Sequence, residues 1–98
     1  MSRGLGDVYK RQDSKLLQWT DSKVALVEFI YAIYAGKCFN NGNTSLKDIA
    51  FCCEILFNIE IGDFYRIFLE IRNRKKSRTQ FLDKLKDKIQ KMMDELDG

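Results

Sequence analysis

The 98-residue sequence contains no histidine and no proline. Histidine is the side chain most often used as a general acid or base near neutral pH, and it is also the commonest metal ligand. Because it is absent, we expect no enzymatic activity, no catalytic residue, no metal site and no cofactor. The absence of proline removes the residue that most often interrupts a helix, so long helices can form without kinks.

Cysteine is scarce and irregularly spaced. The three cysteines are Cys38, Cys52 and Cys53, an odd number in which two are adjacent. This pattern does not suit a disulfide framework, and a thiolate metal site completed by a carboxylate is the weaker interpretation because no Cys-x-x-Cys spacing occurs. We therefore expect free thiols and a reducing, cytoplasmic location. No apolar run is long enough to cross a bilayer, so we expect no membrane contact.

The first twelve residues differ in character from the rest. Residues 1–12 read MSRGLGDVYKRQ and show no apolar periodicity. The stretch DVYKRQ resembles the translation of a transposase adapter used in sequencing libraries, so we expect residues 1–12 to be a non-native or disordered tail. Residues 13–98 would then form a single domain with 14 basic and 13 acidic residues. A net charge of +1 does not indicate nucleic-acid binding, so only a local cluster of basic residues could indicate it.

Four helical segments are expected after this tail. Thr20 can cap a helix that continues to Tyr34, with Gly36 as a left-handed stop and a turn at 40–43. Ser45 can cap a second helix that ends at Phe57, and a third runs over 63–74 with Asp63 at its start. Ser77 and Gln80 have capping-box spacing and would begin a last helix through Leu96. The fold class predicted from these segments is all-α, a small domain of four helices.

The most concentrated chemical signal lies between the third and fourth segments. Residues 72–79, RNRKKSRT, contain five basic residues and no acid. Positive side chains at the end of one helix, followed by hydroxyl groups and free amides at the start of the next, can hold phosphate groups. The alternative is that the basic run only complements a helix dipole and keeps the surface soluble. The residues alone do not decide between these two interpretations.

The chain from Leu17 to Leu96 resembles the C-terminal part of the RteC family, transcription regulators associated with conjugative transposons of gut anaerobes. Two stretches carry this resemblance: LQWTDSKVALVEFIYAIYAGKCFNNGNTSLKDIA over 17–50, and FNIEIGDFYRIFLEIRNRKKSRTQFLDKLKDKIQKMMDE over 57–95. The resemblance implies binding to double-stranded DNA upstream of excision genes by a helix-turn-helix or winged-helix domain.

On this resemblance, the second helix supports the third as a recognition helix. Arg66, Asn73 and Arg74 would face DNA, and Lys75, Lys76 and Arg78 would grip its backbone. The complete candidate set for nucleic-acid binding is Arg66, Arg72, Asn73, Arg74, Lys75, Lys76, Arg78 and Lys47. Two features depart from the family pattern: the connection at 58–62 is longer than a tight helix-turn-helix turn, and the segment after Ser77 is expected to be helical where a wing needs strands.

The resemblance also implies that the chain is a C-terminal fragment of a longer protein. An N-terminal domain would then pack on an apolar surface of the first two helices. The alternative function is a non-catalytic helical protein-interaction module, in which exposed apolar faces dock a partner and the basic run is solvated surface.

Overall fold

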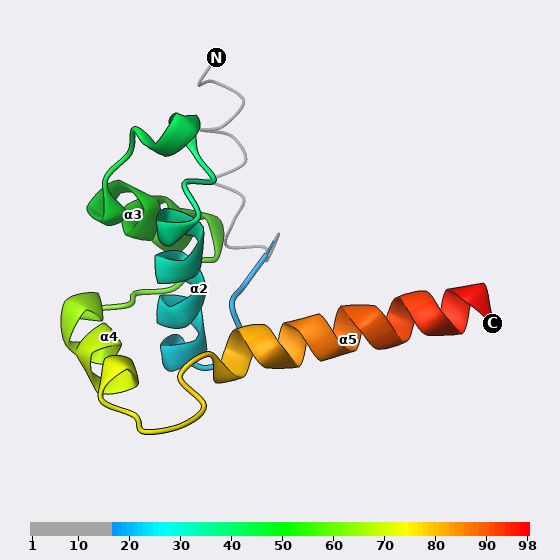
Figure 1. The fold of residues 1–98 in the computed structure, drawn as a ribbon. Helices are drawn as coiled ribbons and strands as arrows, with labels where there is room; N and C mark the ends of the chain where they lie inside the picture. The colour runs from blue at the N-terminus through cyan, green and yellow to red at the C-terminus, as the bar shows by residue number, and fades with distance from the viewer. Residues whose placement is uncertain (1–16) are drawn as a thin grey trace, which may run out of the picture.

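The computed structural model describes residues 17–98, which fold into four α-helices (Figure 1). They are α2 (Lys23–Ala35), α3 (Leu46–Leu56), α4 (Phe64–Arg72) and α5 (Gln80–Asp97), with a short 3-10 turn, η2 (Asn40–Gly42), between α2 and α3. Residues 17–98 contain no β-strand, which confirms the all-α class. A wing has no support in this range, because α5 occupies the segment where its strands would lie. The expected tail at 1–12 lies outside the described residues.

Helix α2 is the centre of the domain. Apolar residues surround most of its circumference, and Leu26, Val27 and Ile30 have no exposed surface. The other three helices pack chiefly against α2, with α3 and α4 on one side and the start of α5 near its N-terminal end (Figure 1). A helix that is apolar on nearly all sides has to be covered in this way.

Both ends of α2 differ from the sequence-based prediction. The N-cap is Ser22, whose hydroxyl accepts the Ala25 N–H at 3.0 Å, so the prediction of Thr20 as the cap was wrong. At the other end Gly36 is right-handed and Lys37 takes the positive φ of 54°, so the left-handed stop was predicted one residue too early. Glycine at position 36 instead avoids a close contact, because a Cβ there would lie 3.3 Å from Cys38 Sγ.

The turn after α2 and the N-caps of α3 and α4 agree with the sequence-based prediction. Asn40, Asn41 and Gly42 all have positive φ, as the predicted turn requires. Ser45 caps α3 by accepting the Asp48 N–H at 3.0 Å, and Asp63 caps α4 by accepting the Arg66 N–H at 3.2 Å. Local cap chemistry therefore fixes where these two helices begin.

The connection between α3 and α4 runs over residues 57–63 and is held by hydrogen bonds that include the side chain of Glu54. Glu54 on α3 accepts the Ile61 N–H at 2.8 Å, and the Ile61 side chain is buried against α2 and α3. This longer connection leaves α3 and α4 each packed mainly on α2. The tight turn of a simple helix-turn-helix is therefore absent between these two helices.

Helix α5 begins later than predicted and extends away from the other helices (Figure 1). Its N-cap is Thr79, whereas Ser77 has a left-handed φ of 58°. Because α5 begins at Gln80, this residue is the first helical position and not the third, so Ser77 is not the N-cap and the predicted capping box is wrong. Phe81 is the one buried residue of α5, and everything after Leu82 is exposed.

Candidate nucleic-acid interface

The junction between α4 and α5 carries the basic cluster found in the sequence. Helix α4 ends at Arg72, with the Asn73 N–H bonded to the Leu69 carbonyl at 3.0 Å. The chain then turns sharply, and the Arg74 N–H bonds to the Ile71 carbonyl at 3.1 Å. These backbone bonds end the helix and direct the following residues into a defined loop.

The far side of the junction is fixed by Glu28 on α2. This carboxylate is only 6% exposed, and its two oxygens accept the backbone N–H groups of Phe81 at 3.1 Å and Leu82 at 2.9 Å. It therefore caps the first turn of α5 from a distant part of the chain, where the helix dipole favours negative charge. This role of Glu28 was not predicted from the sequence. The available signal was that Glu28 is the one charged residue between Lys23 and Lys37.

This cap also corrects the predicted chemistry of the junction. Free amides at the start of the last helix were expected to bind phosphate. Two of those amides are instead bonded to Glu28, and the Asp83 N–H is bonded to the Thr79 carbonyl at 2.9 Å. Any anion held here would therefore rely on the basic side chains, because a buried carboxylate already occupies the helix N-terminus.

Trp19 packs beside this carboxylate cap and closes the core around it. Its indole ring lies against Phe29, Phe57 and Phe81, with centroid separations between 5.7 and 6.5 Å. Its Nε1–H donates to the Ser22 carbonyl at 2.8 Å. The base of α5 is thus held by an aromatic cluster as well as by Glu28.

A second polar contact joins α5 to the segment before α2. Lys84 Nζ lies 3.2 Å from Asp21 Oδ2. The pKa of Asp21 is lowered, first by the hydrogen bond that its carboxylate accepts from the Ser22 N–H and then by Lys84. Since both side chains are exposed, this ion pair orients α5 more than it stabilises the fold.

Four cations of the junction point into solvent. Arg72, Lys75, Lys76 and Arg78 are exposed, and within residues 17–98 none of them lies within 4.0 Å of an acidic oxygen. We call these four residues the basic junction. Asn73 is exposed beside them. With Arg74, six of the eight predicted residues therefore lie together at the junction of α4 and α5.

Arg74 has a different role from its neighbours. Its side chain is half-buried, and Nη1 donates to the Ser77 carbonyl at 3.2 Å. It also lines a hollow beside Asp21 and Glu28. Arg74 thus holds the shape of the loop, and the part of its guanidinium that could face DNA is smaller than the sequence suggested.

Arg66 lies on the exposed side of α4 with two acids beside it. Its Nη1 is 3.2 Å from Glu70 Oε2, and its Nε is 3.8 Å from Asp63 Oδ2. The side chain is 63% exposed, so both pairs are solvated. Arg66 is therefore a candidate for DNA contact that carries less unpaired charge than the basic junction.

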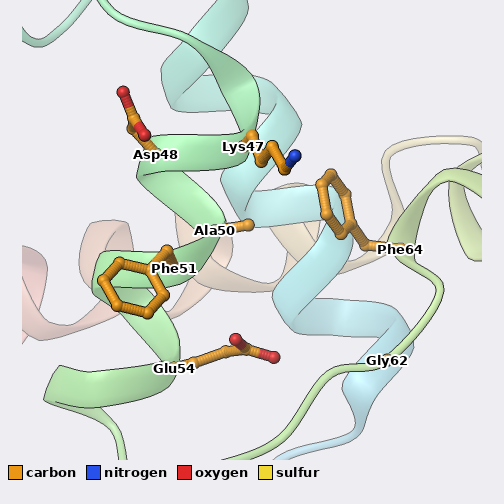
Figure 2. Close-up of a pocket in the computed structure, with 7 residues that line it drawn as sticks. All are labelled: Lys47, Asp48, Ala50, Phe51, Glu54, Gly62 and Phe64. Atoms are coloured by element: carbon orange, nitrogen blue, oxygen red, sulfur yellow. The ribbon is translucent and has the colours of Figure 1, made fainter.

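Lys47 is not part of this cluster. It lies in the first turn of α3, and its side chain runs toward the Phe64 ring across a hollow between α3 and the start of α4 (Figure 2). Two carboxylates, Asp48 and Glu54, line the same hollow, and Glu54 already accepts the Ile61 N–H. Figure 1 places α3 and the α4–α5 junction in different parts of the domain.

The apolar surface expected on the first two helices lies mainly on α3. Helix α2 is covered by the other helices, and Tyr34 is its one exposed large hydrophobic residue. On α3, Phe51 is 60% and Leu56 is 53% exposed. None of the helices within 17–98 is long and apolar enough to span a membrane.

A comparison with protein-family models identifies the chain. The model described as RteC protein matches residues 6–97, and the chain therefore belongs to this family. The match also includes residues 6–12, which belong to the stretch expected from the sequence to be a non-native or disordered tail. Comparisons with curated proteins and with solved structures gave no match.

Proposed function

We propose that this member of the RteC family binds double-stranded DNA through the basic junction, as part of a transcription regulator that controls excision genes of a mobile element. The observation that carries the proposal is the group of four exposed cations at the junction of α4 and α5, none of which pairs with an acidic side chain of residues 17–98. Cations of this kind bind phosphates and release the counterions condensed on DNA, which drives association. The proposed function is non-enzymatic.

The surroundings of the loop favour this interpretation over that of a solvated surface. A loop that only adds solubility has no need of a fixed shape, yet this one is anchored by Arg74 at Ser77 and by Glu28 at the start of α5. An anchored loop loses less conformational entropy when it binds, which favours binding. The basic junction therefore combines charge with a preset geometry.

Base reading is proposed for the exposed side of α4. Asn73 and Arg66 carry the amide and guanidinium groups that can bond adenine and guanine edges in the major groove. Arg66 would first leave Asp63 and Glu70, and an exposed ion pair is worth only about 0.2–1 kcal/mol. The exchange is therefore inexpensive, and phosphate contacts by the basic junction would position α4 for it.

The proposal is tested by titrating a fluorescently labelled duplex with the full chain and following its anisotropy at low salt. The test variant replaces Arg72, Lys75, Lys76 and Arg78 with glutamine. The matched control removes the same charge from exposed lysines elsewhere, namely Lys23, Lys37, Lys86 and Lys91. We expect the test variant to lose at least about tenfold in affinity, and the control to lose much less.

An alternative function is a non-catalytic protein-interaction module. It is favoured by the exposed apolar side chains of α3 and α5. The same titration separates the two functions: a chain that binds no duplex at low salt, or whose test and control variants lose affinity equally, lacks a DNA site at the basic junction.

A further inference from the structure

We propose that α5 mediates an antiparallel dimer of this chain, in which the exposed apolar stripe of one α5 packs against the same stripe of a second copy. The stripe consists of residues separated alternately by three and four positions, the spacing at which two helices pack along a common seam. Its members are Leu82, Leu85, Ile89, Met92 and Leu96.

The stripe is well exposed in the single chain. Leu85 is 40%, Ile89 is 52%, Met92 is 52% and Leu96 is 77% exposed. No helix among residues 17–98 covers it, because α5 extends away from the others beyond its first turns (Figure 1). Exposed large hydrophobic residues are ordinary when scattered, but a continuous row of them along one helix indicates an interface.

The spacing of the stripe fits an antiparallel pair without a gap. In one register Leu85 lies opposite the partner's Leu96, and Ile89 lies opposite the partner's Met92. The two-fold symmetry repeats both contacts, so four apolar layers form along the seam. Leu82 stays at the base of α5, where it also donates its backbone N–H to Glu28.

Charge complementarity selects the antiparallel arrangement over a parallel one. Lys88 and Glu95 flank the stripe on one side, whereas Lys86 and Met93 flank it on the other. An antiparallel pair places each flank against the same flank of the partner, so Lys88 meets the partner's Glu95 twice per dimer. A parallel pair would place Lys88 against the flank of Lys86 and Met93, where it gains no attraction.

The dimer is expected to be weak. One helix pair of this length buries less than the roughly 1,600 Å² of a standard interface. We therefore expect a dissociation constant on the order of micromolar or higher.

The register also sets the distance between the two basic junctions of a dimer. The interpretation of this distance rests on the proposed function, whereas the dimer itself does not. An α-helix rises 1.5 Å per residue, so the two Gln80 residues would lie about 32 Å apart along the helix axis. The basic junction directly precedes Gln80 in each copy. This separation is close to the about 34–36 Å between DNA half-sites one helical turn apart.

The experiment is sedimentation equilibrium of the full chain without DNA, from low micromolar to submillimolar concentration. We expect a reversible monomer–dimer equilibrium. Ile89→Glu places a carboxylate in the seam of each copy and is expected to weaken dimerisation by at least about tenfold. Gln90→Glu adds the same charge outside the seam and is the matched control. Circular dichroism of each variant checks that α5 stays helical.

Charge reversal then tests the register. Lys88→Glu and Glu95→Lys are each expected to weaken the dimer a few-fold, because each places like charges together, and the double variant is expected to restore it. The proposal would be overturned if the wild-type chain stayed monomeric at every concentration or formed a trimer. It would also be overturned if Ile89→Glu dimerised as tightly as wild type, or if the double variant dimerised more weakly than both single variants. Since no DNA is present, these outcomes are independent of the titration that tests the proposed function.

Discussion

At the scale of single residues, Glu28 has the largest effect on where the basic junction lies. Its carboxylate joins the middle of α2 to the first turn of α5, and nothing in the sequence near residue 80 indicates this contact. Hydrogen bonds to a charged acceptor contribute more than neutral ones, and a buried amide left without its acceptor costs further free energy. Loss of Glu28 should therefore loosen α5 and the loop before it.

We predict that Glu28→Gln lowers the free energy of unfolding by about 1–3 kcal/mol, because the amide NH₂ of glutamine cannot accept one of the two backbone N–H groups. Chemical denaturation followed by circular dichroism measures the change. Glu60→Gln removes the same charge from an exposed position and should stay within about 0.5 kcal/mol of wild type. Equal effects of the two substitutions would contradict the role given to Glu28.

The cysteines should differ in reactivity. Cys38 and Cys52 are exposed, whereas Cys53 is buried and burial raises its thiol pKa from 9.0 to about 11. Since the thiolate is the nucleophile, we predict that iodoacetamide at mildly alkaline pH modifies Cys38 and Cys52 first and Cys53 only after unfolding. Peptide mass spectrometry reads out each site. The raised pKa also means that the unfolded chain loses the Cys53 proton at lower pH than the folded chain. The contribution of Cys53 to the free energy of unfolding is therefore lost as pH rises from about 9 toward 11.

At the scale of elements, helix starts were predictable where the capping side chain directly precedes the apolar run. Ser45 directly precedes Leu46, Asp63 directly precedes Phe64, and both predictions are confirmed. Where two hydroxyl residues lie two positions apart, tertiary contacts decide. Trp19 fixes the chain before α2 through its bond to the Ser22 carbonyl. The start of α5 is set by Glu28, a contact more than fifty residues away in sequence.

The corrected N-cap of α2 gives a direct test. We predict that Ser22→Ala destabilises the domain by about 1 kcal/mol, because the Ala25 N–H loses its acceptor. Thr20→Ala should have little effect, since Thr20 is exposed and lies outside the helix. Thermal denaturation of both variants measures the difference. If Thr20→Ala lowered the stability more than Ser22→Ala, Thr20 and not Ser22 would be the N-cap of α2.

At the scale of the whole molecule, the helical class and the position of the basic loop follow from local patterns in the sequence. Apolar periodicity and turn residues are local signals, and they indicate four helices in the observed order. The arrangement of α3, α4 and α5 around α2 depends on long-range packing, which these patterns do not encode. The same holds for the site: Arg72, Lys75, Lys76 and Arg78 were found as a cluster, but the acids beside Arg66 and the inward turn of Arg74 became visible only in the fold.

The measurement that tests the central claim most directly is the salt dependence of duplex binding. Each phosphate contact contributes about −0.9 to the slope of log affinity against log salt concentration. We predict that replacing Arg72, Lys75, Lys76 and Arg78 with glutamine makes this slope less negative by about 3 to 4. If wild type and the variant give the same slope, these residues do not contact the DNA backbone, and the basic junction is solvated surface.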